Sequence, residues 1–423
     1  MKKFEHVAIK EGNPKWTESI ARQTPIENKP GEIRTDFTRD YNRILHCTAY
    51  RRLKHKTQVF FSPKDDTICT RIEHVNHVTA VSYTISKNLG LNAELTNAIA
   101  IGHDLGHAPF GHSGEQILKK IIENFERCDN VETHPSTSSG GCASLPKNET
   151  FWHERNSLRV IDKIELLENA SAKLLNLNLT YAVRDGIVSH CGEVDEHSII
   201  PRSENIDLYE IQEPGSHAPY TWEGCVVKIS DKISYLGRDI EDALRMNILN
   251  DEQLSEFRDI LGHTKIKHLN NTTLMHNFVV DLCEHSSPET GIKLSDEFVY
   301  LMDEVKRFNY KYIYKHKRLN NYVRYAELII NTIYETLSEL YDGVKTPENI
   351  DRSANIHPKL SMAFARWLKY YTLQLRWEKD SKFQNEILYD LTKPEDYTQA
   401  IVDFIASLTD RVAIELFEEL TTF

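Results

Sequence analysis

Residues 71 to 115 read RIEHVNHVTAVSYTISKNLGLNAELTNAIAIGHDLGHAPFGHSGE. From Arg71 to Leu89 the apolar residues recur every three or four positions, which is the period of an α-helix with one buried face. They are Ile72, Val75, Val78, Val81, Ile85 and Leu89. The next segment, Leu95 to Ile101, is almost wholly apolar and predicts a short buried helix. This helix would carry His103 and Asp104 into the interior, where an imidazole and a carboxylate need a partner, and a metal ion is one.

The end of the stretch, HDLGHAPFGHSGE, contains three histidines and two carboxylates. An imidazole nitrogen beside a carboxylate oxygen suits zinc, manganese or iron better than calcium. His107 follows His103 by one helical turn, so the two rings share a face if the helix continues past Gly106. The density of these side chains indicates a metal site with additional histidines beside it.

Pro109 and Gly111 favour a break in the helix, because proline lacks a backbone donor and glycine tolerates turn geometry. The break leaves His112 and Glu115 on a loop or at the start of a new helix. A histidine near a metal can donate a proton to a leaving oxygen, and a neighbouring carboxylate can hold it in the useful tautomer. We therefore expect an acid-base pair here.

A second polar segment, KISDKISYLGRDIEDALR, covers residues 228–245. Asp231, Tyr235 and Asp239 are spaced by four, so they form one line along a helix. Such a line is also typical of a solvated helix face. A metal site built on the His-Asp pair and His74 requires a further ligand, and Asp231 offers one.

The chain as a whole has 423 residues, a formal net charge of −12 and seven cysteines without a CxxC pair. The cysteine pattern argues against a disulfide scaffold and a zinc ribbon. No apolar run is long enough for a membrane span, and the N-terminus lacks an apolar signal core. We therefore expect a cytoplasmic protein without membrane contact. The negative charge disfavours a nucleic-acid platform, although residues 306 to 325 mix aromatic and basic side chains as single-strand grooves do. Single-stranded nucleic acid is therefore a partner that we do not favour.

Helical spacing continues through most of the chain, which predicts a mostly α fold. We divide it into an N-terminal segment (1–33), a catalytic core (34–260) and a helical C-terminal region (261–423). Residues 128 to 150 are rich in serine, glycine and proline, and predict a flexible insertion. We expect a loop from about Asp195 to Thr221. His46, His55, His77 and His190 are expected to be structural or surface residues.

These motifs together resemble the HD-domain deoxynucleoside triphosphate triphosphohydrolases, a group that includes bacterial dGTPases and the vertebrate SAM-and-HD-domain dNTPase. The resemblance runs from about residue 34 to 320. The motifs that carry it are, in chain order, Arg52, Leu53, Lys56 and Gln58; Arg71 and His74; His103, Asp104, His107, His112 and Glu115; Asp231, Tyr235 and Asp239; and Tyr314, His316 and Lys317. The serine- and glycine-rich insertion departs from the family pattern. The residues around Asp231 are closer to its broad-specificity branch than to strict dGTPases.

The resemblance implies a helical HD-domain bundle that hydrolyses deoxynucleoside triphosphates to deoxynucleoside and inorganic tripolyphosphate. The implied metal ligands are His74, His103, Asp104 and Asp231, with Mn²⁺, Mg²⁺ or another metal such as Fe, Ni or Zn as cofactor. The implied catalytic residues are His112, Glu115 and His107, where Glu115 orients either His112 or the attacking water. The implied substrate-binding residues are Gln58, Arg71, His153, Lys232, Tyr235, Asp239 and Tyr314.

The family likeness also implies a homo-oligomer, a tetramer or a hexamer, with a nucleotide effector as a further partner. Two other functions fit parts of the pattern. One is an HD-type nucleotide phosphatase or phosphodiesterase with the same metal ligands. The other is a regulatory protein that binds dNTP or single-stranded nucleic acid, which would need no proton donor. The basic residues near the site favour a substrate with a longer phosphate tail.

Overall fold

The computed structural model describes residues 2–26, 31–60, 65, 67–129, 150–169, 171–191, 198–262, 271–376 and 382–422. The described residues are mostly α-helical, as predicted, with one small two-stranded sheet among them. The chain forms two compact units. Unit 1 consists of Met1–Leu105 and Leu177–Tyr322, and unit 2 consists of Gly106–Asn176 and Val323–Phe423. The domain boundaries drawn from the sequence at 34 and 261 stay a prediction. Nearly all of the predicted insertion at 128–150 lies outside the described residues.

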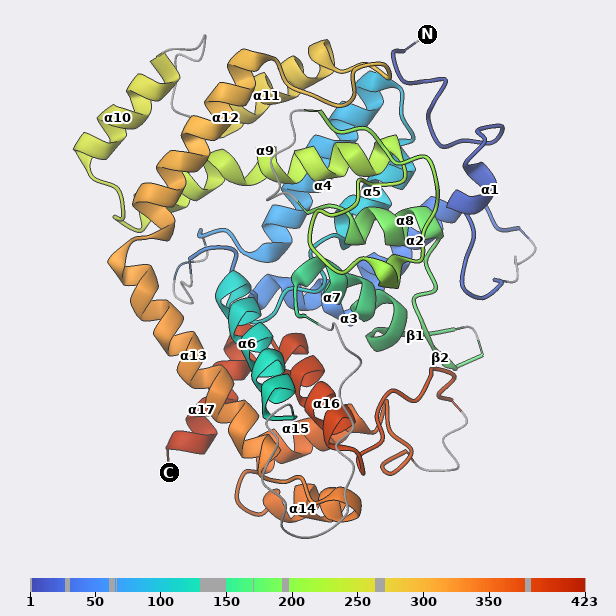
Figure 1. Cartoon of the computed structure of the whole chain (residues 1–423), viewed down its shortest axis with the longest axis vertical. Coiled ribbons are helices and arrows are strands. Elements are labelled where there is room, and N and C mark those ends of the chain that lie inside the picture. The colour runs from blue at the N-terminus through green and yellow to red at the C-terminus, as the bar shows by residue number, and fades with distance from the viewer. Residues whose placement is uncertain are drawn as a thin grey trace. The chain divides into compact units, whose positions relative to one another are not determined.

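Unit 1 is built almost entirely from helices. Its helices are α1 (Trp16–Ser19), α2 (Asp36–His46), α3 (Thr48–Arg52), η1 (Leu53–His55), α4 (Arg71–Leu89), α5 (Ala93–Gly102), α8 (Tyr181–Val188), η3 (Leu208–Glu210), α9 (Trp222–Arg245), α10 (Asp251–Gly262), α11 (Asn271–His285), α12 (Asp296–Asn309) and the π-helix η4 (Tyr310–Tyr314). α4 packs against α5 and α9, and α5 also packs against α2 and α8 (Figure 1). The short helix η3 interrupts the loop predicted before α9.

Helix α4 has clear start and stop signals in its sequence. The Thr70 backbone N–H donates to the Glu73 carboxylate at 2.7 Å, which satisfies one of the donors that a helix start leaves unpaired. Gly90 ends the helix in the left-handed region, at φ 91°, where glycine carries no Cβ penalty. The predicted apolar stripe is buried from Val75 to Leu89, while Ile72 is half-buried. Each fully buried Val, Ile or Leu side chain contributes about 1.5–3 kcal/mol to folding.

Helix α9 carries the whole polar line that was predicted from the sequence. Its apolar residues Ile229, Ile233, Leu236 and Ile240 are buried in the main core cluster of unit 1. Asp231, Tyr235 and Asp239 follow each other at one-turn intervals on the same helix, as predicted. The spacing therefore reflects a helix that packs one face and presents polar side chains beside that face.

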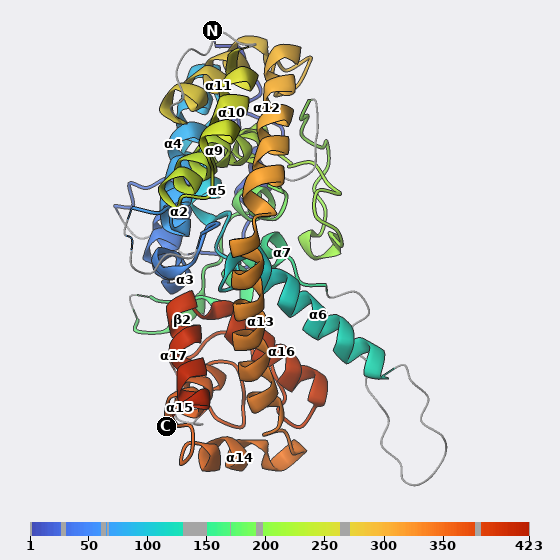
Figure 2. The ribbon, with the colours of Figure 1, turned by 90° about the vertical axis from the view of Figure 1, so that its left-hand side faces the viewer.

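Unit 2 contains α6 (Gly111–Asp129), α7 (His153–Arg159), the π-helix η2 (Val160–Ile164), β1 (Leu166–Glu168), β2 (Leu174–Asn176), η5 (Gly343–Lys345), α14 (Thr346–Ser353), α15 (Pro358–Leu368), α16 (Pro394–Ser407) and α17 (Asp410–Thr421). It also contains the part of α13 (Lys317–Ser338) that follows Tyr322. Helix α15 packs against α14, α16 and α17 (Figure 2).

The helical spacing predicted for most of the chain gives way to strand structure at one place in unit 2. Strands β1 and β2 pair antiparallel there, with Leu167 opposite Leu175. Each strand has only three residues, which is too short for period-two alternation to stand out from the helical pattern. The hairpin is extended by a parallel bridge between Leu174 and Phe383.

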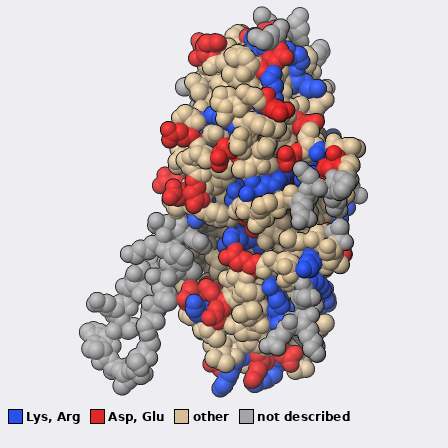
Figure 3. Space-filling view, turned by 90° about the vertical axis from the view of Figure 1, so that its right-hand side faces the viewer, with Lys and Arg blue, Asp and Glu red and all other residues tan. Residues whose placement is uncertain are grey.

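The molecular surface carries both signs of charge. Lys and Arg side chains are interspersed with Asp and Glu over the face drawn in Figure 3. Among the described residues, no helix is both long enough and apolar enough to cross a membrane. None of the five cysteines whose side chains are described forms a disulfide; they are Cys47, Cys69, Cys191, Cys225 and Cys283.

Candidate metal centre and acid-base cluster

Four predicted metal ligands meet inside unit 1, where they come from three packed helices. His74 lies on α4, His103 and Asp104 follow α5, and Asp231 lies on α9. The His74 Nε2 atom is 2.9 Å from Asp231 Oδ1 and 3.9 Å from Asp104 Oδ2. The His103 Nε2 atom is 3.5 Å from Asp104 Oδ1 and 3.8 Å from Asp231 Oδ1. Ligand atoms about 2.0–2.2 Å from one ion are separated by such distances, so this donor set fits a divalent transition metal.

The tautomer of His103 suits a metal ligand. Its Nδ1 atom lies 2.7 Å from the carbonyl oxygen of Ala100. Because a carbonyl oxygen only accepts, Nδ1 carries the proton of the neutral ring, and Nε2 keeps a lone pair directed at the carboxylates. Helix α5 ends at Gly102, so the helix does not continue past Gly106. His107 therefore does not share a helical face with His103.

The buried His74 forms an ion pair with the partly buried Asp231. Burial by itself would lower the pKa of His74, but the hydrogen bond and charge of Asp231 raise it above the ordinary value. Burial would likewise raise the pKa of Asp231, yet His74 holds it well below its usual range. Metal ligands must be deprotonated, so a metal ion at this site would replace the His74 proton.

Arg71 lies next to the metal-ligand candidates, and its side chain is almost completely buried. Its Nη1 donates to Asp104 Oδ2 at 2.8 Å, and its other nitrogens donate to the carbonyl oxygens of Thr57 at 3.2 Å and Gln58 at 3.4 Å. The structure shows Arg71 holding the carboxylate of Asp104, a metal-ligand candidate, and the phosphate contact predicted for Arg71 stays a prediction. The buried Gln58 Oε1 has no hydrogen-bond partner among the described residues.

His190 lies beside this cluster, although the sequence suggested a structural or surface residue. It is buried, and its ring stands edge-on to the His103 ring at a centroid distance of 4.9 Å. One signal could have found it. His190 comes just after the last turn of α8, as His103 comes just after the last turn of α5.

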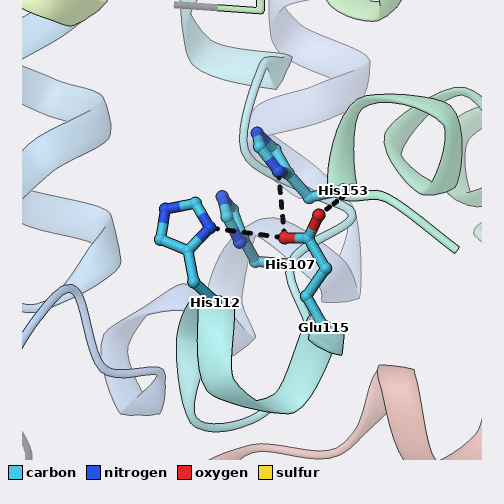
Figure 4. A group of neighbouring side chains, drawn as sticks. All are labelled: His107, His112, Glu115 and His153. Carbon is cyan, nitrogen blue, oxygen red and sulfur yellow. Dashed lines mark hydrogen bonds and ion pairs between the residues drawn. The ribbon is translucent and has the colours of Figure 1, made fainter. Parts of the chain in front are cut away.

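The second group of predicted residues lies in unit 2 and is drawn in Figure 4. His107, His112 and His153 lie around the carboxylate of Glu115. Glu115 Oε2 is 3.4 Å from His112 Nδ1 and 3.2 Å from His153 Nδ1. The His107 and His153 rings stack with centroids 3.9 Å apart. Helix α6 begins at Gly111, which confirms a new helix start before His112.

Glu115 is an ionised carboxylate that orients two imidazoles. Burial would raise the pKa of Glu115, but His153 and the hydrogen bonds from His112 and His153 hold it far below the ordinary value. The carboxylate fixes Nδ1 of His112 as a donor. The His112 side chain is 57% exposed, so this ring can reach a ligand that the buried Glu115 cannot. We predicted that His153 contacts substrate, and the structure places it on the Glu115 carboxylate.

The backbone before α6 is held in an unusual conformation. Phe110 has φ 65°, which costs a non-glycine residue of the order of 1 kcal/mol. Its N–H donates to Asp410 Oδ1 at 2.8 Å, which fixes the turn. Gly106 contacts the start of α7 so closely that an added Cβ would lie 2.1 Å from the Ser157 nitrogen. These contacts hold the segment that carries His107 and His112.

The residues predicted at the sugar lie in unit 1. The Tyr314 hydroxyl donates to Asp239 Oδ2. Burial raises the pKa of Asp239 to about 7, against the opposing hydrogen bond from Tyr314. Tyr235 is half-buried and Lys232 is buried on α9. Tyr314 ends the π-helix η4, a local geometry that often occurs at functional sites.

The chain is similar in sequence to known proteins over most of its length. The HD domain model matches residues 71–236, which contain all four metal-ligand candidates. A deoxyguanosinetriphosphate triphosphohydrolase-like protein of Desulfatibacillum aliphaticivorans is 31% identical over 92% of this chain and 89% of its own. Proteins with the same description from Caldanaerobacter subterraneus subsp. tengcongensis and Clostridium perfringens (strain SM101 / Type A) are 31% and 33% identical, over 93% and 82% of this chain and 87% and 89% of their own. The chain belongs to the HD-domain deoxyguanosinetriphosphate triphosphohydrolase-like family.

Proposed function

We propose that this protein is a metal-dependent hydrolase that converts deoxynucleoside triphosphates into deoxynucleoside and inorganic tripolyphosphate. The observation that carries the proposal is the cluster of the buried His74, His103 and Asp104 with the partly buried Asp231, whose ligand atoms are spaced for one divalent ion. The names of the family relatives support the substrate class. Mn²⁺ or Mg²⁺ is the metal we propose, with Fe, Ni and Zn as alternatives.

The proposed reaction is water attack at the α-phosphorus with departure of the sugar 5′ oxygen. When bound, the metal ion would polarise the α-phosphate and promote ionisation of the attacking water. His112 donates a proton to the departing 5′ oxygen, and Glu115 keeps its ring in the required orientation. The P–O5′ bond breaks, the P–O bond to water forms, and the water proton leaves to solvent or a nearby base. The products are therefore a deoxynucleoside with a free 5′-hydroxyl and tripolyphosphate, which keeps the oxygen of the attacking water.

We propose that the metal cluster and the His112–Glu115 pair act on the same substrate. Only Leu105 and Gly106 separate Asp104 from His107 in the chain. His107 and Lys232 supply positive charge or hydrogen bonds to the phosphate oxygens, an electrostatic contribution that is usually large in such reactions. Gln58 and Asp239 bind the 3′-hydroxyl, and Tyr235 and Tyr314 crowd the 2′ carbon. The buried oxygen of Gln58 supports this role, because a ligand hydroxyl can satisfy it.

The test is product analysis with each of the four common dNTPs and Mn²⁺ or Mg²⁺. Deoxynucleoside with tripolyphosphate supports the proposal, and broad use of all four bases is the expected pattern. Release of dNMP with pyrophosphate, or of dNDP with phosphate, contradicts the attack at the α-phosphorus with sugar oxygen leaving. Hydrolysis of monophosphates or cyclic nucleotides alone would favour the phosphatase or phosphodiesterase alternative. Tight dNTP binding without turnover would favour the regulatory binding protein.

We also propose that the protein works in the cytoplasm as a homo-oligomer, a tetramer or a hexamer, with a nucleotide as effector. Light scattering during size-exclusion chromatography, with and without added dNTPs, measures the assembly directly. A monomer under all these conditions contradicts this part of the proposal.

A further inference from the structure

His190 follows α8 and is buried in unit 1. Its Nδ1 atom lies 2.5 Å from the carbonyl oxygen of Ile187. Because that oxygen can only accept, Nδ1 carries the proton of the neutral imidazole. The Nε2 atom then keeps its lone pair, which is the form of histidine that binds a metal ion.

His103 is held in the same way. It follows α5, and its Nδ1 donates to the carbonyl of the residue three positions earlier, as His190 does. Helices α5 and α8 pack against each other, so their two C-terminal ends present equivalent histidines to the same region. A backbone carbonyl on the far nitrogen is a common way to fix the tautomer of a metal-binding histidine.

His190 also lies close to the other metal-ligand candidates. Its ring is perpendicular to that of His103, with an interplanar angle of 83° and centroids 4.9 Å apart. The ligand atoms of His103, His190 and Asp231 all lie within 4.8 Å of one another. Two ligand atoms on opposite sides of one ion, each about 2.1–2.2 Å from it, are slightly closer together than this limit. A small side-chain movement would therefore bring the His190 nitrogen within bonding distance of the ion.

We propose that His190 is a third imidazole ligand of the metal ion held by His74, His103, Asp104 and Asp231. This inference rests on the proposed metal site and extends it. A third nitrogen donor has a chemical consequence, because imidazole suits zinc, iron or nickel, whereas magnesium prefers oxygen ligands. His190 would therefore bias the site toward a transition metal.

The first test compares metal affinity of purified variants by competition with a chromogenic chelator. We expect His190→Gln to bind Mn²⁺ at least about tenfold more weakly, with a smaller effect on Mg²⁺. His46→Gln, which replaces an exposed histidine on α2, serves as the matched control and should bind as wild type. His103→Gln serves as the positive control. Wild-type Mn²⁺ affinity in His190→Gln, beside a loss in His103→Gln, overturns this inference alone. Wild-type affinity in both variants overturns the proposed metal site as well.

The second test uses the wild-type protein, so it holds even if His190→Gln fails to fold. X-ray absorption spectroscopy of the Zn²⁺- or Mn²⁺-loaded protein counts imidazole ligands through their multiple-scattering signals. Three imidazoles support the inference. Two imidazoles, those of His74 and His103, overturn it.

Discussion

Arg71 donates a charge-assisted hydrogen bond to Asp104, with 2.8 Å between Nη1 and Oδ2, and both side chains are buried. Asp104 Oδ1 faces His103, so one carboxylate links the guanidinium to the metal ligands. A buried arginine beside a carboxylate is costly to remove alone, because the remaining charge loses its partner. Arg71 thus orients the acidic half of the His-Asp pair.

Replacing Arg71 with glutamine should weaken metal binding by about 10- to 100-fold, the usual effect of removing a residue that orients a ligand. Activity should fall with it and recover in part at high metal concentration. Equilibrium dialysis against Mn²⁺ measures the change, and Arg51→Gln on the exposed surface of α3 is the control. Unchanged metal affinity with a raised KM for dNTP would return Arg71 to the phosphate-binding role predicted from the sequence.

Removing His112 should leave metal binding intact and slow turnover. His112→Ala should reduce kcat by about 10² to 10⁴, the range for a lost proton donor. Glu115→Gln should give a smaller loss, because the amide can still contact the His112 and His153 rings without the negative charge. Steady-state kinetics with parallel metal analysis tests both variants, with His55→Ala as the control for an exposed histidine. A near-normal kcat in His112→Ala would assign the proton to His107 or His153.

The helical fold and the clustering of the metal-ligand candidates could be predicted from the sequence because they follow local rules. The stripe on α4 and the four-residue spacing on α9 are helix periodicities, and His103 and Asp104 are neighbours in the chain. The position of His190 depends on how α8 packs against α5, which periodicity does not report. The contact between His153 and Glu115 has the same cause, since 38 positions separate the two residues. The sequence could not show that Arg71 is buried against Asp104, because that contact follows only from tertiary packing. The phosphate contact of Arg71 stays a prediction.

Stability should depend on pH through Glu223, a buried carboxylate in the first turn of α9. Its carboxylate accepts the backbone N–H of Ile9 at 3.0 Å and of Asn92 at 2.9 Å, yet burial raises its pKa from 4.5 to about 7. The folded protein therefore binds this proton more tightly than the unfolded chain. The associated stability is fully present below about pH 4.5 and is lost as the pH rises through about 7.

Glu223→Gln should remove this dependence, because the amide has no charge to desolvate while its oxygen can still accept both N–H groups. Relative to wild type, the variant should gain about 1–3 kcal/mol between pH 5 and pH 8. Urea unfolding of both proteins at the two pH values gives the difference. Glu210→Gln, a change at an exposed residue, is the control. Parallel pH profiles for Glu223→Gln and wild type would show that Glu223 is ionised throughout.

Sugar selection tests the contact between Tyr314 and Asp239. If Tyr314 crowds the 2′ carbon, Tyr314→Ala should use GTP far better relative to dGTP than wild type does. Tyr314→Phe keeps the ring and loses only the hydrogen bond to Asp239, so it should still reject GTP. The two variants therefore separate the steric effect of the ring from the effect of the hydroxyl.

The 3′-hydroxyl offers the complementary measurement, because Gln58 and Asp239 are proposed to read it by hydrogen bonds. An unpaired buried polar group costs about 1–3 kcal/mol, so dideoxy-GTP should have a kcat/KM about one to two decades below that of dGTP. In Gln58→Ala the difference in kcat/KM between dGTP and dideoxy-GTP should become smaller. The reason is that the Gln58 amide, which the dideoxy sugar leaves unpaired, is absent from this variant. Comparing dGTP, GTP and dideoxy-GTP on wild type and the three variants decides the matter. Equal rates for all three nucleotides on wild type would mean that neither Gln58 nor Tyr314 contacts the sugar.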